Sequence, residues 1–476
     1  GMVPLTPPQR WFFEQNYPEP QQCCEVILLE IKAPLEPALI CQALESIEKQ
    51  HTALYLRFVQ VQHCWQQKHQ HDKRAIAFTQ IDLSACSSEV QGAAQTRTLL
   101  EVNQGMNLEH GPLLHMVLFQ LGPSQPDRLL LAWHYLIADA FSLRILLEDF
   151  QNSYQQLVQG QQPRLPPCPI SFQWWAQSLA AYAQSAEALQ ELPFWAYQRE
   201  NEHLSQLPVD FSQDAPANTF ASAATVHIQL DQEKTGELLR SMPAVAHNAL
   251  QEILLTALIM EVTRWSGKQA LLVELEYHGR IVDQMDQNLS RTVGRLAYRY
   301  PLLLSLPVAF NARSAFNAIR EQLSQVPRNG IGYGLLSYLH SQPENAGQPW
   351  TPVQAALRFN YIGHLGQAFA QSTLFRPVSN GLGVAVPFPG LRPYLLEITA
   401  FLLDGELHIL WEYSQHLHRS ATIESLAQNY LASLQELLTH CLTSPVPASI
   451  SSLGLSQSEL EALLNYLESS QGATDE

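Results

Sequence analysis

LLLAWHYLIADAFSLRILLEDF (Leu129–Phe150) changes from one hydrophobic pattern to another around a histidine and an aspartate. A continuous apolar run ends at His134, as expected for a buried strand, and apolar residues then recur at helical spacing. Asp139 precedes that helical pattern, where a carboxylate can accept hydrogen bonds from free backbone N–H groups. The stretch therefore predicts a strand followed by a capped helix, and it raises the question whether His134, Tyr135 and Asp139 also form a site.

The same alternation of strands and helices continues along the chain. Cys24–Ile31 has the composition of a strand, and Leu35–His51 shows helical spacing. Two apolar segments on either side of the turn residues 123–127 predict a β-hairpin. In the second half, strands are predicted at 225–230, 270–279, 355–363 and 406–414, and helices at 248–265, 314–323 and 423–442. The sequence thus predicts an α/β protein with two lobes of similar size.

A polar, proline-containing stretch at 201–222 separates the two series of elements. We predict an N-terminal lobe at 1–180 and a C-terminal lobe at 181–450, with the hinge between about residues 175 and 220. Residues 451–476 are predicted to be a tail or linker that ends in a disordered segment.

Composition excludes several classes of protein. With 476 residues, 46% of them hydrophobic and only 15% charged, the chain is expected to fold into more than one globular unit. Its net charge of −17 argues against binding to nucleic acid or to anionic membranes. The seven cysteines show no CxxC spacing, and no apolar run is long enough to span a membrane. We therefore expect a soluble, cytoplasmic protein with reduced thiols.

Common motifs of catalysis and metal binding are largely missing. The glycines at 330–334 lack the lysine of a phosphate-binding loop, and the chain has no GxSxG motif. One candidate metal site remains, made of His63, His69, His71 and Asp72, but a solvated hairpin tip is the favoured interpretation. The prediction is no metal site and no intrinsically bound cofactor.

Six ordered segments give a stronger signal than any single motif. They are VPLTPPQRWFFEQN, WHYLIADAFSLRILLEDF, VELEYHGR, DQNLSRTVGRLAYRYP, PRNGIGYGLLSYL and RFNYIGHLGQ. This series resembles the condensation-domain superfamily of nonribosomal peptide synthetases, and most specifically its epimerization branch. The resemblance runs from about Val3 to Cys441, and LGLSQSELEALL after it is similar to the usual tail of that branch.

The resemblance implies a fold and a substrate. The fold would be two chloramphenicol-acetyltransferase-like lobes in a V-shaped pseudo-dimer with a central tunnel. Carrier proteins would dock at the tunnel mouths and insert a phosphopantetheine arm bearing an aminoacyl or peptidyl thioester. In the epimerization branch, two acid–base groups remove and return the Cα proton, and a buried tunnel excludes water.

The residues that the resemblance implies for this chemistry are only partly retained. His134 matches the first histidine of the HHxxxDG motif, whereas Tyr135 occupies the position of the second, catalytic histidine. Asp139 is retained, and Ala140 replaces the glycine. In the second lobe, Glu276 matches the glutamate of the EGHGR motif, which faces the catalytic histidine in the branch.

The resemblance implies roles for five further positions. Arg280 would pair with Asp139 across the lobes as a structural salt bridge. His278, Asn360 and Tyr361 would line the tunnel or contact substrate. Arg295 would also lie there, where the branch usually has tryptophan. The stretch PEPQQCCEV near the start also differs from the PEPHHWNQ-like stretch of the branch.

The substitution at Tyr135 is chemically severe. Phenols ionise near pKa 10 and imidazoles near about 6.5, so generating a phenolate at pH 7 costs roughly 4 kcal/mol. Four hypotheses follow: a silent platform for carrier proteins or a recruited tailoring enzyme, Cα-proton chemistry by Tyr135 and Glu276, amide or ester condensation by positioning alone, and a free acyltransferase. The second requires burial to raise the pKa of Glu276. The substitution favours the first.

Overall fold

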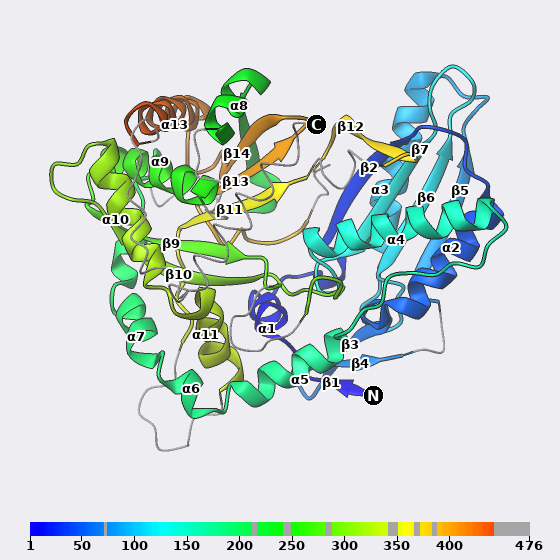
Figure 1. The fold of residues 1–476 in the computed structure, drawn as a ribbon, viewed down its shortest axis with the longest axis horizontal. Coiled ribbons are helices and arrows are strands. Elements are labelled where there is room, and N and C mark those ends of the chain that lie inside the picture. The colour runs from blue at the N-terminus through cyan, green and yellow to red at the C-terminus, as the bar shows by residue number, and fades with distance from the viewer. Residues whose placement is uncertain are drawn as a thin grey trace, which may run out of the picture.

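The computed structural model describes most of the chain, at residues 1–70, 74–211, 217–240, 249–280, 288–340, 351–365, 372–382 and 388–441. The predicted tail at 451–476 lies outside these residues, as do His71 and Asp72. Figure 1 shows two sheets side by side, each with its own helices, so the predicted α/β architecture of two lobes is confirmed.

Five strands form the sheet of the first lobe, in the order β12-β2-β7-β6-β5. Their bounds are β2 (Cys24–Ile31), β5 (Ile76–Asp82), β6 (Leu114–Gln120), β7 (Arg128–His134) and β12 (Phe375–Leu382). The strands β6 and β7 are antiparallel neighbours, which confirms the predicted hairpin. Because β12 comes from the second half of the sequence and pairs with β2, it connects the two lobes.

The apolar run before His134 is continuous because both faces of β7 are covered. Leu129 and Leu131 lie in the main core, which also contains residues of α2 (Pro37–Gln50) and α4 (Ala140–Val158). The alternate residues Leu130 and Ala132 pack in a second core with α3 (Ser88–Gly105). The end of β7 is therefore fixed from two sides.

Six strands form the sheet of the second lobe, in the order β10-β9-β11-β13-β14-β8. Their bounds are β8 (Ala223–Leu230), β9 (Ala270–Tyr277), β10 (Tyr298–Ser305), β11 (Leu357–His364), β13 (Leu396–Leu403) and β14 (Glu406–Ser414). Three packed helices lie beside this sheet (Figure 1): α9 (Ala249–Ser266), α10 (Ala312–Ser324) and α13 (Ser420–Cys441). Helix α9 is buried almost all round, which explains its nearly uninterrupted hydrophobic sequence.

The remaining helices and a small third sheet pack against the two large sheets or between them. They are the helices α1 (Pro7–Glu14), α5 (Phe172–Tyr182), α6 (Ala186–Leu189), α7 (Leu192–Glu200), α8 (Gln232–Arg240) and α11 (Ile331–Gly334), and the small sheet of β1 (Met2–Val3), β3 (Leu56–Val61) and β4 (Cys64–His69). In Figure 1, α1 lies between the two large sheets and α5 runs below them from one lobe toward the other.

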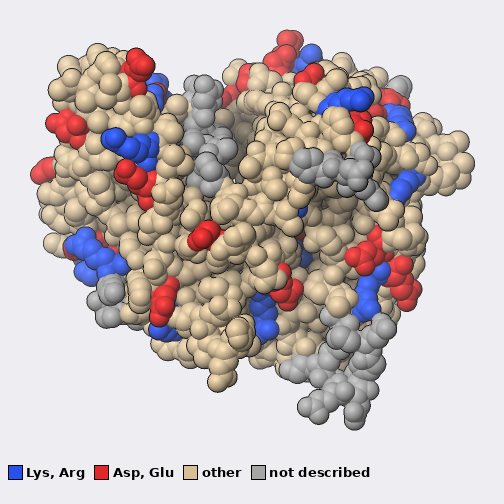
Figure 2. All heavy atoms as spheres, turned by 180° about the vertical axis from the view of Figure 1, so that it is seen from behind, with Lys and Arg blue, Asp and Glu red and all other residues tan. Residues whose placement is uncertain are grey.

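The surface agrees with the low charge content of the sequence. Figure 2 shows Lys and Arg interspersed with Asp and Glu on a mostly uncharged face, without a large patch of one sign. Among the helices of the described ranges, none combines the length and the hydropathy needed to cross a bilayer.

Candidate functional site

His134 is held rigidly at the end of β7. Its Nε2 lies 2.8 Å from the carbonyl oxygen of Pro20, while its Nδ1 accepts a hydrogen bond from the backbone N–H of Leu136 at 3.1 Å. Because a carbonyl only accepts, the proton of the neutral ring lies on Nε2. Burial lowers the pKa of His134 to about 4. With both ring nitrogens engaged, His134 orients the turn rather than offering a free base.

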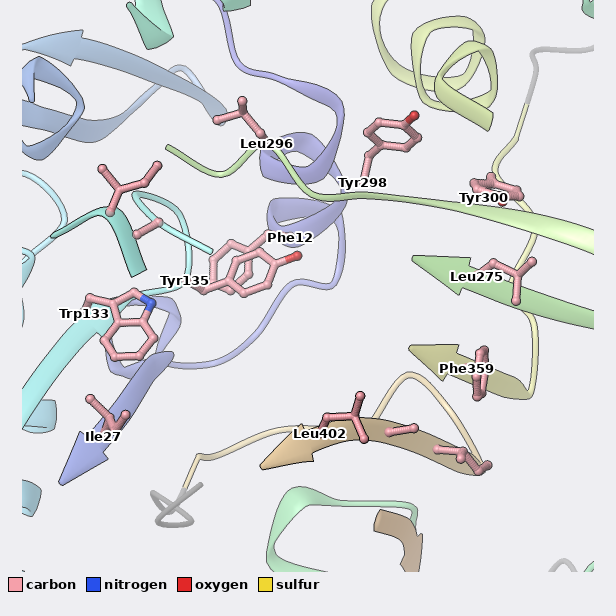
Figure 3. Close-up of a cluster of buried hydrophobic side chains, with 14 of the residues drawn as sticks. Phe12, Ile27, Trp133, Tyr135, Leu275, Leu296, Tyr298, Tyr300, Phe359 and Leu402 are labelled. Carbon is pink, nitrogen blue, oxygen red and sulfur yellow. The ribbon is translucent and has the colours of Figure 1, made fainter. Parts of the chain in front are cut away.

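Tyr135 directly follows His134 and is buried, with arginines of the second lobe next to its ring. Its ring stacks on Phe12 of α1 with centroids 5.3 Å apart, and the guanidinium of Arg295 lies 3.7 Å from its centroid on the second-lobe side. Figure 3 shows the Tyr135 ring beside Phe12, with the hydroxyl directed away from β7 toward the strands of the second lobe. An aromatic ring with an arginine over it thus occupies the position of the motif's second histidine.

Asp139 caps α4 and joins the two lobes. Its carboxylate accepts two hydrogen bonds from Arg280, at 2.5 and 2.8 Å, and both side chains are at most 4% exposed. It also accepts from the backbone N–H groups of Ser142, Leu296 and Ala297. Burial alone would raise the pKa of Asp139, but Arg280, Arg295 and the hydrogen bonds to the carboxylate together outweigh burial and lower it. This carboxylate is a structural anchor with no spare acceptor for chemistry.

The backbone conformation at residue 279, and its close contact with Leu296, explain why a glycine precedes Arg280. It has a φ of +72°, and a Cβ at this position would lie 2.1 Å from the backbone carbonyl oxygen of Leu296. Since Leu296 also donates to Asp139, the same close approach places Arg280 and its carboxylate partner together.

Glu276 lies near the end of β9, where two arginines bind its carboxylate. Its Oε2 accepts from Arg299 Nε at 3.0 Å and from Arg358 Nη2 at 2.6 Å, and its Oε1 lies 3.4 Å from the amide nitrogen of Asn360. Burial would raise the pKa of Glu276, but Arg358, Arg299 and Arg295 outweigh it and hold the pKa well below its ordinary value. The raised pKa that base chemistry at Glu276 requires is therefore not what this environment produces.

Glu276 belongs to a row of ion pairs across one face of the second sheet. Arg358 also binds Glu397 of β13 at 3.0 Å, and Arg392 bridges Glu397 and Glu412 of β14, each at 3.1 Å. Arg392 is fully buried, so its charge depends on these carboxylates. These ion pairs hold the polar side chains of this face in place. Arg299, which binds Glu276, lies 5.9 Å from the ring centroid of Tyr135.

Arg295 faces Glu25 of β2 in the other lobe. Its Nη1 lies 3.6 Å from Glu25 Oε1, and its buried Nε has no hydrogen-bond partner in the part of the chain that the structure describes. Glu25 Oε2 accepts a hydrogen bond from Trp133 Nε1 at 2.9 Å. Burial raises the pKa of Glu25, and Arg295 opposes that rise.

Of the remaining predicted site residues, His278 and Asn360 contact residues of this centre, whereas Tyr361 packs against the hydrophobic core. His278 stacks on Tyr277 and Phe141, accepts from the backbone N–H of Arg280 and has its pKa lowered by burial to about 4. Asn360 contacts Glu276, as described above. Tyr361 is half-buried on β11, and burial raises its pKa to about 12.

The candidate metal cluster receives no support from the residues that can be placed. His63 is exposed in the β3–β4 turn with a φ of +65°, as expected for a hairpin tip, while His69 ends β4. No group of three or more metal-binding side chains occurs within the described ranges.

Sequence reasoning missed Glu25, Arg299 and Arg358 as members of the site. Each is a charged residue inside an otherwise apolar strand, and such residues are rarely buried unless they are paired. That pattern was available in the sequence, but it could not identify the partner of each charge.

Comparisons with known proteins agree with this geometry. The Condensation domain family model matches residues 1–452. One of the proteins that make up linear gramicidin synthase in Brevibacillus parabrevis is 34% identical over 441 residues, which are 92% of this chain but 6% of that protein. Tyrocidine synthase 1 of the same organism is 31% identical over 98% of this chain and 43% of its own length. The chain thus spans a small part of these curated relatives.

Two solved structures are also similar. The epimerization domain from the third module of tyrocidine synthetase B is 31% identical, with a TM-score of 0.84 over 93% of this chain and 98% of that one. SgcC5 from Streptomyces globisporus has a TM-score of 0.69 over 92% of this chain and 98% of its own, but only 15% identity, so it supports the fold alone. Together with the family match, these likenesses show that the chain belongs to the condensation-domain superfamily of nonribosomal peptide synthetases and resembles its epimerization branch.

Proposed function

We propose that this domain binds aminoacyl or peptidyl thioesters tethered to a carrier protein and does not carry out ordinary two-base epimerization. The thioester would enter on the phosphopantetheine arm, between Tyr135 on one side and the ion-pair row of Glu276 on the other. Its biological role would be that of a platform for carrier proteins, on which a tailoring enzyme can meet the tethered substrate.

One observation supports the proposal: a tyrosine stands at the position of the catalytic histidine, and Glu276 at the second position is bound by two arginines. Tyr135 replaces the histidine and packs between Phe12 and Arg295. Glu276 is stabilised as a carboxylate by Arg299 and Arg358, which makes it a weak proton acceptor. Inversion requires one group to accept a proton and another to donate one on the opposite face, so weakening both positions should suppress it.

The contacts that join the two lobes and order the polar residues of the site are nevertheless retained. The pair Asp139–Arg280 still joins the lobes, and polar residues such as Glu276 and Asn360 are ordered by hydrogen bonds rather than replaced by a collapsed apolar core. A domain that had lost its substrate altogether would have no need of this costly buried polar arrangement.

The test measures binding and inversion with one set of carriers. A carrier protein loaded with an L-aminoacyl or dipeptidyl thioester should bind more tightly than the same carrier without its phosphopantetheine arm, measured by calorimetry. After incubation, chiral chromatography of the released amino acid should show no D-isomer above a sample without the domain. Equal affinity for both carriers would contradict the binding proposal, and D-isomer formation above background would contradict the loss of epimerization.

A further inference from the structure

Two departures from the family pattern meet in space beside Tyr135. Glu25 comes from the stretch PEPQQCCEV and Arg295 from TVGRLAYRYP, which lie in different lobes and far apart in the sequence. The structure places Arg295 Nη1 3.6 Å from Glu25 Oε1 and sets the guanidinium 3.7 Å from the ring centroid of Tyr135. The guanidinium of Arg295 thus lies next to both Tyr135, at the position of the missing histidine, and the carboxylate of Glu25.

Glu25 is better suited to accept a proton than Glu276. The Glu25 side chain is 40% exposed, whereas that of Glu276 is 12% exposed. Glu276 shares one oxygen between two arginines at 3.0 and 2.6 Å, while Glu25 receives one tryptophan N–H and a more distant guanidinium. Desolvation of the part of the carboxyl that packs against the protein raises the pKa of Glu25, and Arg295 only partly opposes that rise.

Arg295 is the buried arginine that contacts Tyr135 most closely. The residue is 4% exposed, and, like Arg358 and Arg392, it has a buried Nε without an acceptor among the described residues. A buried donor without a partner is costly, unless a ligand supplies the acceptor. When a thioester loses its Cα proton, negative charge moves to the carbonyl oxygen, and a fixed guanidinium can stabilise that oxygen.

We propose that Glu25 is the base and Arg295 the enolate-stabilising group of a one-base proton-transfer site for carrier-tethered aminoacyl thioesters. This inference rests on the proposed entry of the tether between the lobes. The Glu25 carboxylate takes the Cα proton, and the C–H electron pair forms the enolate, whose charge lies on the thioester oxygen beside Arg295. The proton, or a solvent deuteron that has exchanged onto the Glu25 carboxyl, returns to Cα on the same face. Configuration is retained, which is consistent with the proposed loss of epimerization.

The test follows deuterium incorporation at Cα in D2O, with binding of the loaded carrier measured on the same samples. The wild-type domain should incorporate deuterium above a sample without protein and release only the L-isomer. Glu25→Gln keeps an oxygen that can accept from Trp133 but loses the basic carboxylate, so incorporation should fall at least tenfold. Arg295→Met should also reduce it at least tenfold.

Matched controls come from another ion pair whose glutamate lies on β2, the strand of Glu25. Glu30 of β2 binds Arg376 of β12 at 2.6 Å on the surface, so Glu30→Gln and Arg376→Met make the same chemical changes elsewhere. Both should retain incorporation within twofold of the wild type.

Three results would overturn the inference. Wild-type incorporation at background with carrier binding intact would remove the proton-transfer site and leave the proposed binding function standing. Full incorporation by folded Glu25→Gln would exclude Glu25 as the base. Failure of the loaded carrier to bind would overturn the proposed function and this inference with it.

Discussion

The buried pair of Asp139 and Arg280 gives the sharpest prediction about stability. Removing one partner of a buried, hydrogen-bonded ion pair typically costs about 3–5 kcal/mol, because the other charge loses its counterion. The two single substitutions should fall at different ends of that range, since the groups left behind are satisfied to different extents.

Arg280→Met leaves a carboxylate that still accepts from three backbone N–H groups, at 2.9, 3.0 and 3.0 Å. Its cost should therefore be near about 3 kcal/mol. Asp139→Asn leaves a buried guanidinium that still donates to the carbonyl oxygens of His278 and Thr292 but has lost its counterion, and it turns an amide NH2 toward groups that are themselves donors. Its cost should be near about 5 kcal/mol. Because each substitution removes the same contact, the double variant should cost less than the sum by about 2–3 kcal/mol.

Urea denaturation followed by tryptophan fluorescence measures these differences at pH 7. The pKa of Asp139 is lowered in the folded state, so its contribution is complete above the unfolded-state pKa of about 3.9 and is lost as pH falls through the folded-state pKa. The advantage of the wild type over Asp139→Asn should thus be constant from about pH 5 to 8 and shrink below about pH 4. Additive single costs, or a larger cost for Arg280→Met than for Asp139→Asn, would refute this reasoning.

Three further predictions address the site and the core. Tyr135→His restores an imidazole at the motif position, and we expect D-isomer formation, measured by chiral chromatography, to rise above the sample without the domain; formation that stays at background would show that Tyr135 is not the limiting position and that the arginine-bound Glu276 also prevents inversion. Gly279→Ala places a Cβ against the Leu296 carbonyl at a φ of +72°, so the free energy of unfolding from urea denaturation should fall by about 1–3 kcal/mol or more. An unchanged urea midpoint would contradict the close approach. Leu254→Ala in the buried part of α9 should cost about 2–5 kcal/mol in the same assay, and a loss below about 1 kcal/mol would show that the main core is loosely packed around α9.

The sequence alone determined the architecture, because periodicity is a local property. Leu129–Phe150 predicted a strand and a helix, and the structure has β7 to His134 and α4 from Ala140, with Asp139 as its cap. The resemblance of six ordered segments supplied the family and drew attention to Tyr135. These inferences needed only spacing, residue type and order along the chain.

The chemistry of the site depended on the tertiary structure, because an ionisable side chain takes its properties from neighbours that are distant in sequence. Glu276 was a candidate base until Arg299 and Arg358, on adjacent strands, were seen to bind its carboxylate. Nothing in the local sequence identifies the partner of Glu25, and its role depends on the fold, which places Arg295 of the other lobe 3.6 Å from it. The sequence therefore shows which acids and bases are available, whereas their basicity follows from the charges and the burial that only packing provides.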